Sequence, residues 1–198
     1  MIFGGLVMAN VDRPNGFRPV KTRSGAPWTS MIRTVGVADG TDIFPGDAIT
    51  LSSGLAAAST AHADNIVGVA VGFGKKNDMS LRAGGMFNPD ALMTTYYDDS
   101  ASTHTDWVCY YVPAEDVLFE AQFDGTPTTP VVGQGYGLTY TTGSTSTGRS
   151  QQEIDGDDTS DVDVVIVEIP DYDDNDHTAA YGRVWVMFDD QVFVNNTA

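Results

Sequence analysis

Residues 117–123 read Val117-Leu118-Phe119-Glu120-Ala121-Gln122-Phe123, and this stretch decides the fold class of the chain. Apolar side chains occupy every second position, and the positions between them hold Leu118, Glu120 and Gln122. Successive side chains of a β-strand point to opposite faces, so a period of two residues indicates a strand with one buried face. The stretch therefore predicts a half-buried strand rather than an amphipathic helix.

Similar strand patterns recur along the chain. A turn precedes an alternating segment with Ile49 and Leu51 on one face, and residues 66–73 form an apolar run that glycines interrupt. Residues 162–169 and 184–188 are predicted as two further strands. Turn residues return about every eight to twelve positions, and no long segment keeps a 3.6-residue apolar period, which argues for short strands. We expect a mainly β protein made of small antiparallel β-barrel or sandwich lobes with an extended N-terminal arm.

The same signals divide the chain into three parts. We expect residues 1–30 to form a leader and the extended arm, residues 31–112 a first β lobe, and residues 113–198 a second β lobe. Residues 45–51 and 132–138 share a glycine turn that leads into a strand. This likeness indicates either a duplication of one lobe or the common form of any entry into a β-strand.

The first seven residues, Met1 to Val7, are an apolar leader. They lack a positively charged start and are too few for a secretory signal peptide. We therefore expect Met8 to be the biological start. No later stretch reaches the roughly 18 apolar residues that a membrane-spanning helix needs, so no membrane partner is expected.

The N-terminal arm, residues 8–30, is rich in residues that interrupt regular structure. Its three prolines and two glycines exclude a helix, and no regular alternation supports a core strand. Its large apolar side chains would each contribute roughly 1.5 to 3 kcal/mol when buried, and it carries four of the ten basic residues of the chain. We expect the arm to lie on another protein, which it would contact through Arg13, Phe17, Arg18, Val20, Lys21, Arg23 and Trp28.

Three groups of residues carry a resemblance to a known family. The arm contains MAN at residues 8–10, PNGFRPV at 14–20 and SGAPW at 24–28. The other two groups are DVLFEAQFDG at residues 116–125, and TGRS at 147–150 followed by an acidic loop and two apolar strands. In these residues the chain resembles the capsid cement, or decoration, proteins of tailed bacteriophages.

The resemblance implies a structural role in the virion. A protein of this family binds the outer surface of the phage head, stabilises the lattice of the major capsid protein, and assembles as a homotrimer. By this analogy the arm would run between capsid subunits, with its basic side chains facing acidic residues and with Phe17 and Trp28 in apolar pockets. In the alternative interpretation, Trp28 folds back onto its own lobe, because tryptophan is highly buried on average.

The composition of the chain argues against several other classes of function. The formal net charge of −17 and the sequence pI of about 4.1 argue against a nucleic-acid partner, which would need a basic surface. A single cysteine excludes an internal disulfide. Cys109 lies in the apolar run 107–111, which predicts a buried strand residue, whereas a reactive thiol would need a basic neighbour to lower its pKa.

Several motifs hold side chains that could form a chemical site. The acidic segment 171–176 has alternating oxygen ligands, but it lacks the glycine and the glutamate of a calcium loop, so a charged surface loop is the expected structure. Calcium bound with other ligands stays open. The pairs His62–Asp64 and His104–Asp106 lack a third ligand at a suitable spacing. No phosphate loop and no nucleophile elbow is present. We expect that the protein is not an enzyme and that it binds neither a metal ion nor a cofactor.

Two other functions remain as alternatives. The first is a receptor- or glycan-binding module of a phage head or tail fibre, suggested by Tyr96, Tyr97, Tyr110 and Tyr111 near acidic loops. The same tyrosines are also explained by packing between strands. The second is a calcium-dependent hydrolase.

Overall fold

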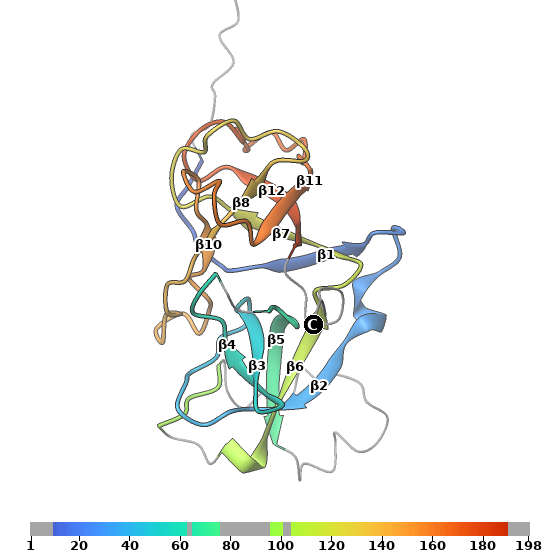
Figure 1. Cartoon of the computed structure of the whole chain (residues 1–198), viewed down its shortest axis with the longest axis vertical. Coiled ribbons are helices and arrows are strands. Elements are labelled where there is room, and N and C mark those ends of the chain that lie inside the picture. Colours follow the sequence, from blue (N-terminus) through green and yellow to red (C-terminus); the bar gives the residue numbers. More distant parts are fainter. Residues whose placement is uncertain (1–9, 63–64, 76–95, 101–103, 190–198) are drawn as a thin grey trace, which may run out of the picture.

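The structure of the protein, a computed structural model, describes residues 10–62, 65–75, 96–100 and 104–189. The predicted leader and Met8 lie outside the described residues. The protein is mainly β, as predicted, with two five-stranded antiparallel sheets and a separate two-stranded ribbon. Figure 1 shows the two sheets one above the other along the long axis of the molecule, with strand β1 crossing between them.

The first sheet is formed by the middle of the chain, in the order β2-β6-β5-β3-β4. It curls so strongly that its two outer strands meet, because Val37, directly after β2, forms a bridge with Ala56 of β4. The amide of Ala38 then donates a hydrogen bond of 2.8 Å to the carbonyl oxygen of Ala56. The strands are β2 (Arg33–Gly36), β3 (Ala48–Ser52), β4 (Leu55–Ala58), β5 (Gly68–Lys75) and β6 (Trp107–Pro113).

The second sheet has the order β1-β7-β12-β11-β8. Its strands are β1 (Arg18–Thr22), β7 (Val117–Gln122), β8 (Gly135–Tyr136), β11 (Val164–Glu168) and β12 (Arg183–Phe188), and the ribbon pairs β9 (Leu138–Thr139) with β10 (Glu153–Ile154). The described residues contain no α-helix, only the short 3-10 helices η1 (Trp28–Met31) and η3 (His104–Asp106). None of the helices in these ranges has the length and apolar character needed to cross a bilayer.

Strand β7 is buried on both faces, not on one as its alternation predicts. Phe119 and Ala121 point into the core, but Glu120 and Gln122 on the other face are only 9% and 8% exposed. The reason is that β7 lies between β1 and β12, and its polar face is covered by Tyr172, from a later loop, and by Glu153 of β10, which hydrogen-bond to Glu120 and Gln122. A polar side chain in such a position is tolerated because it is hydrogen-bonded.

Part of the arm, for which the sequence supports neither a helix nor a core strand, forms the edge strand β1. Residues Arg18 to Thr22 pair with β7 in antiparallel register, with Arg18 opposite Glu120 and Thr22 opposite Val117. The register shifts between Pro19 and Lys21. A proline cannot donate to a strand ladder, but β1 is an edge strand with an irregularity at the proline, which is where a sheet accepts one.

One hydrophobic core joins the two lobes. It contains Val69 and Val112 from the first sheet together with Phe119, Val186 and Phe188 from the second. A second cluster fills the interior of the first sheet. The chain passes from one sheet to the other between β6 and β7, at residues 113–117. The two sheets therefore share a core, and residues 31–112 and 113–198 are called the first and the second lobe below.

The two similar turns have the same local geometry. Gly46 and Gly133 have φ angles of +99° and +90°, which only glycine adopts without strain. Beyond the turns the strands differ, because β3 lies between β4 and β5, whereas β8 is an edge strand. The likeness is thus confined to the turn and the entry into the strand.

Candidate partner-binding surface along the N-terminal arm

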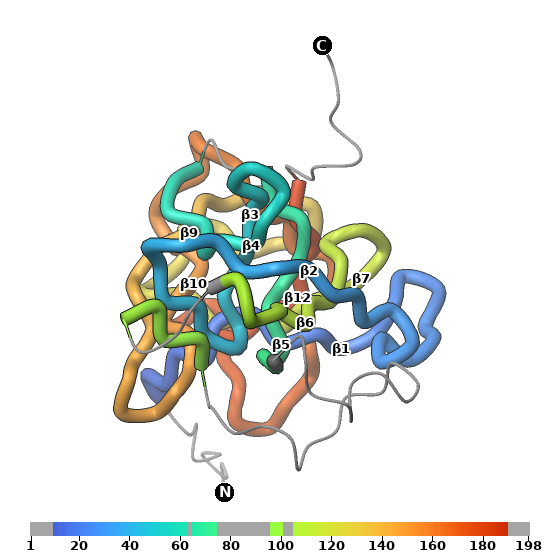
Figure 2. Tube along the Cα trace, turned by 90° about the horizontal axis from the view of Figure 1, so that it is seen from below, coloured from blue at the N-terminus to red at the C-terminus, as the bar shows by residue number. Residues whose placement is uncertain are grey.

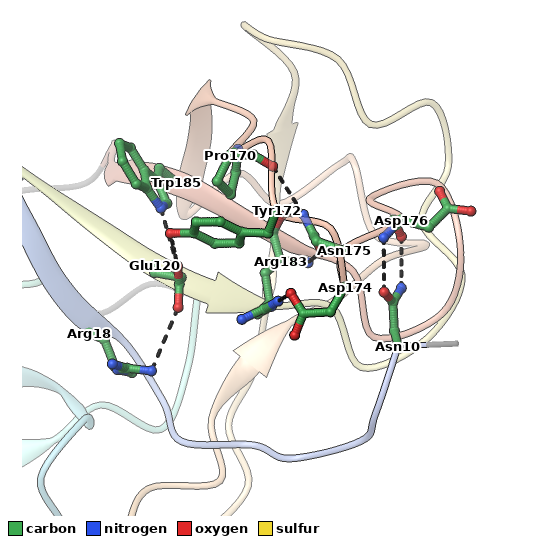
Figure 3. A network of polar contacts seen from close by, with 10 residues as sticks. All are labelled: Asn10, Arg18, Glu120, Pro170, Tyr172, Asp174, Asn175, Asp176, Arg183 and Trp185. Atoms are coloured by element: carbon green, nitrogen blue, oxygen red, sulfur yellow. Dashed lines mark hydrogen bonds and ion pairs between the residues drawn. The ribbon is translucent and has the colours of Figure 1, made fainter. Parts of the chain in front are cut away.

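The structure describes residues 10–30 of the arm. At the start of this range, the side chain of Asn10 is hydrogen-bonded to the backbone of the second lobe. The Asn10 amide donates a hydrogen bond of 2.7 Å to the carbonyl oxygen of Asp176, and its oxygen accepts the Asp176 amide at 2.9 Å (Figure 3). The same side-chain amide also donates to the carbonyl oxygen of Ala180 at 2.9 Å. Three residues later, the amide of Arg13 donates to Gln122 Oε1 at 3.3 Å. The start of the arm is therefore fixed on the second lobe.

Phe17 lies in the shared core, not on a surface. Its side chain is 1% exposed, and its ring centroid is 4.9 Å from that of Phe188. Its amide donates to the carbonyl oxygen of Gly46 at 2.8 Å. The prediction that Phe17 docks into a pocket of another protein is therefore wrong, because Phe188 and the β-turn at Gly46 enclose it within its own chain.

Arg18 extends from β1 toward a buried carboxylate. Its guanidinium lies 3.7 Å from Glu120 Oε1, and the arginine side chain is 65% exposed against 11% for the glutamate. Glu120 also accepts hydrogen bonds from the Tyr172 hydroxyl at 2.9 Å and from Trp185 Nε1 at 3.3 Å (Figure 3). Glu120 thus has three partners within the chain, while much of the Arg18 guanidinium faces solvent.

Lys21 is held by two contacts. Its Nζ lies 2.9 Å from Glu168 Oε2 and 4.5 Å from the ring centroid of Trp185. A cation over an indole face is attracted by about 0.5 to 1 kcal/mol at an exposed site. Among the basic arm residues that were predicted to contact a partner, Lys21 makes the most contacts within its own chain.

Arg13 and Arg23 are exposed, and neither guanidinium group forms an ion pair with another of the described residues. Arg23 stands at the start of a projecting corner, residues 23–27, all of which are exposed. Its backbone is fixed, because its amide donates to the carbonyl oxygen of Asp116. Trp28 follows the corner and is half-buried against the shared core, so the interpretation in which it folds back onto its own lobe holds.

An open groove runs beside β1. It has a volume of about 700 Å³, and its walls are β1 on one side and the loop 171–174 on the other. Figure 2 shows this arrangement from below, with the orange-red loop next to the blue β1. Val20 is half-buried in the wall of the groove. The lining residues are Arg18, Pro19, Val20, Glu120, Asp171, Tyr172, Asp173, Asp174 and Arg183.

The acidic loop 171–176 is organised around Arg183. Arg183 Nη2 donates to Asp174 Oδ1 at 2.6 Å, and its guanidinium lies 5.0 Å from the ring centroid of Tyr172. Asn175 accepts the amide of Arg183 at 2.7 Å and donates to its carbonyl oxygen at 2.9 Å. Asp176 turns away to bind Thr178, whose hydroxyl and amide lower the pKa of that carboxyl.

Metal ligands do not converge in the part of the chain that the structure describes, where no group of three His, Cys, Asp or Glu side chains has a suitable arrangement. His62 contacts Asp163, and Asp64, the other member of its sequence pair, lies outside the described residues. The side chain of His104 is also outside them. The segment 171–176 is therefore a surface loop held by an arginine.

The tyrosines proposed as a glycan platform are packing residues. Tyr97 is 1% exposed, Tyr110 and Tyr111 are 7% exposed, and Tyr96 stacks on Phe44 with ring centroids 4.5 Å apart. They do not form an exposed aromatic surface. Cys109 is also buried, as predicted, and burial raises the pKa of its thiol, which opposes a reactive thiolate.

Four residues of this surface were not predicted from the sequence, namely Glu120, Tyr172, Arg183 and Trp185. Trp185 alternates with Val184 and Val186 along β12, so a period of two could have placed it on the face opposite the core. The register sets Trp185 directly opposite Glu120. No short sequence signal indicates that pairing.

Comparison of the chain with protein-family models, curated proteins and solved structures finds no match. A functional proposal therefore has to start from the arm and from the groove beside β1.

Proposed function

We propose that the protein is a structural virion protein, a capsid cement protein that binds the outer surface of a phage head and stabilises the lattice of its major capsid protein. One observation supports this most. In a chain with a formal net charge of −17, the arm exposes three arginine side chains, Arg13, Arg18 and Arg23. The resemblance in residues 8–28, 116–125 and 147–150 supplies the biological setting.

The arm is suited to contact because it is already ordered. Asn10, the β1–β7 pairing and the Arg23 amide fix its backbone at three places. Ordering a flexible segment on binding costs free energy, and a pre-organised segment avoids that cost. The arginine fork matches a carboxylate in two hydrogen bonds, so the proposed partner surface is an acidic strip of the capsid protein.

The contacts of a single copy are weak. Exposed ion pairs contribute about 0 to 1 kcal/mol each, and Phe17 is not available to add an apolar anchor. Strong attachment would therefore come from repetition, because linked copies bind with a high effective concentration. Assembly as a homotrimer on the capsid surface, which the resemblance implies, would provide that repetition. The proposed role involves no catalysis, cofactor, nucleic acid or membrane.

Charge reversal in the arm tests the proposal. Purified protein is mixed with heads that lack it, and the bound fraction is measured by sedimentation. Arg13→Glu and Arg23→Glu are each expected to weaken binding about fivefold, the equivalent of about 1 kcal/mol per exposed contact. Both side chains are exposed, so the isolated variants should keep the wild-type circular dichroism spectrum.

Arg149→Glu is the matched control, since Arg149 is exposed, lies outside the arm and undergoes the same change of charge. It should bind like the wild type. Equal binding of all three variants and the wild type would contradict the role of the arm, while equal loss in all three would indicate non-specific charge attraction.

A further inference from the structure

A pocket lies where the start of the arm crosses the second sheet. It has a volume of about 300 Å³, and arm residues between positions 10 and 15 form one of its walls. The rest is formed by side chains of β1, β7 and β12 and of the loop before β12. Three lining residues, Arg18, Asp174 and Arg183, also line the groove beside β1, so the two spaces adjoin. The smaller space is here called the arginine pocket.

The register of the second sheet places two of the arginines on one face. Arg18 of β1 lies opposite Glu120 of β7, and Arg183 of β12 lies opposite Gln122 of β7. Residues that are directly opposite in an antiparallel pair share a face, and so do residues two apart on one strand. Arg18 and Arg183 therefore extend from the same face of the sheet, on either side of β7.

Arg13 enters the pocket from the arm. Its amide donates to Gln122 Oε1 at 3.3 Å, and its carbonyl oxygen accepts the side-chain amide of Asn15 at 3.2 Å. The backbone of Arg183 is held in a similar way, because Asn175 bonds both its amide and its carbonyl oxygen. The arginines thus extend from fixed backbone, which lowers the cost of ordering them around a ligand.

The charges around the arginine pocket do not balance. Arg183 pairs with Asp174 at 2.6 Å, and Arg18 lies 3.7 Å from Glu120. Figure 3 shows these two pairs side by side. Neither pair includes Arg13, so three guanidinium groups face two carboxylates.

The acidic neighbour of Arg13 in the sequence does not restore the balance. Asp12 does not line the pocket, and its Oδ1 accepts a hydrogen bond from Gln122 Nε2 at 3.4 Å. In a chain with a formal net charge of −17, a pocket with an excess of positive charge is a local exception. Such a pocket attracts an anionic group.

Two further lining residues fit a binding site. Tyr181 has a φ angle of +61°, which is an outlier for a bulky side chain. Strained backbone of this kind gathers at sites that bind ligands. Val11 is 59% exposed at the pocket, where it offers an apolar contact to the methylene groups of a ligand.

We infer that the arginine pocket binds one side-chain carboxylate, from an aspartate or glutamate of a partner protein. The guanidinium fork matches a carboxylate in two hydrogen bonds. One positive charge without a counter-charge fits one carboxylate, whereas the phosphate dianion would leave an excess of negative charge. The adjoining groove is lined by four carboxylates, so the pocket is the part of this surface that suits an anion. That the partner is the capsid protein rests on the proposed function.

An NMR titration of the whole protein at constant ionic strength tests the pocket. The probe is a blocked pentapeptide with one central glutamate, and the same peptide with glutamine is its control. The Nε–Hε signals of Arg13, Arg18 and Arg183 should shift with the glutamate peptide, and those of Arg33 and Arg149 should not. No shift, or the same shifts with the glutamine peptide, would overturn the inference.

Two variants measure the contribution of the arginines. Arg13→Gln and Arg18→Gln are each expected to weaken binding of the glutamate peptide about fivefold, as for the loss of one exposed charge contact. Arg149→Gln is the matched control, because Arg149 is exposed and does not line the pocket, and it should bind like the wild type. Equal weakening in all three variants would mean diffuse attraction and would contradict the pocket. If Arg18→Gln fails to fold, Arg13→Gln still decides the question.

Inorganic phosphate tests the other anion that arginine pairs with. It is expected to bind less tightly than the glutamate peptide, because Asp174 and Glu120 already supply negative charge. Tighter binding of phosphate would make this a phosphate site and the inference wrong. These titrations contain no phage heads, so their outcome is separate from the proposed function. Head binding without peptide binding would overturn the pocket alone, and peptide binding without head binding would support the pocket but exclude the capsid protein as its partner.

Discussion

His62 Nδ1 lies 2.6 Å from Asp163 Oδ2, and this pair connects the two β lobes. The Asp163 side chain is 2% exposed and that of His62 is 38% exposed. Burial raises the pKa of Asp163, partly offset by His62. Burial also lowers the pKa of His62, but the hydrogen bond and charge of Asp163, with the charges of Asp158 and Asp161, outweigh it and raise that pKa above 6.5.

The pair predicts a pH-dependent contribution to stability. Because the pKa of His62 is higher in the folded protein, its contribution is complete below pH 6.5 and is lost as the pH rises through the folded-state value. His62→Gln should lower the free energy of unfolding by about 1 kcal/mol at pH 6, since the ring is partly exposed. The difference from the wild type should shrink toward pH 9. Urea titrations at both values measure it, and His177→Gln is the control. A difference that does not vary with pH would contradict the prediction.

Phe17→Ala should destabilise the isolated protein. The ring is 1% exposed and packs on Phe188, so its removal leaves a cavity in the shared core. The expected loss is about 3 to 5 kcal/mol in the free energy of unfolding, measured with urea. Val11→Ala, at a residue that is 59% exposed, should change it little. If Phe17→Ala unfolded like the wild type, Phe17 would not be a core residue.

Gly16→Ala should loosen the arm. Gly16 has a φ angle of +64°, and a Cβ there would lie 2.2 Å from the carbonyl oxygen of Gly46. Both strain and overlap would destabilise the protein, by more than about 2 kcal/mol. Gly25→Ala separates the two effects, because Gly25 has a φ angle of +87° but nothing within 4 Å of the added atom. It should cost about 1 kcal/mol. Equal losses would show that the contact with Gly46 is unimportant.

Glu153 should make the protein less stable at alkaline pH. Burial first, and then the charges of Asp12 and Asp124, raise its pKa to about 7, against the hydrogen bond that Gln122 donates at 2.6 Å. The folded state therefore favours the protonated form, and stability falls as the pH rises from about 4.5 to about 7. Glu153→Gln should raise the unfolding temperature at pH 8 and change it little at pH 4.5. A lower unfolding temperature at pH 8 would contradict this assignment.

The strands with clear alternation were predictable from the sequence. The segment at Ile49 and Leu51 became β3, and the run at Val184 became β12, because a period of two records which face is buried. Strand β1 was not predictable, since two of its five residues are basic and one is proline. Its pairing with β7 is a long-range contact that local residues do not encode.

The candidate surface was predictable only in part. The basic residues of the arm are visible in the sequence, and Arg13, Arg18 and Arg23 are indeed exposed. The residues next to Phe17 in the sequence do not show whether its side chain is exposed or buried. Its contact with Phe188, at the other end of the chain, shows that it is a core residue. The groove wall formed by Tyr172 and Arg183 likewise depends on a loop folding back over β7.

If the protein is a capsid cement protein, as we propose, it covers a phage head in many copies. The most direct measurement is its molar ratio to the major capsid protein in purified phage particles that contain it, by quantitative mass spectrometry. We predict a ratio near one or a simple fraction set by the symmetry of the lattice. A few copies per particle would contradict the cement role and favour a fibre module, and complete absence would rule out a virion protein.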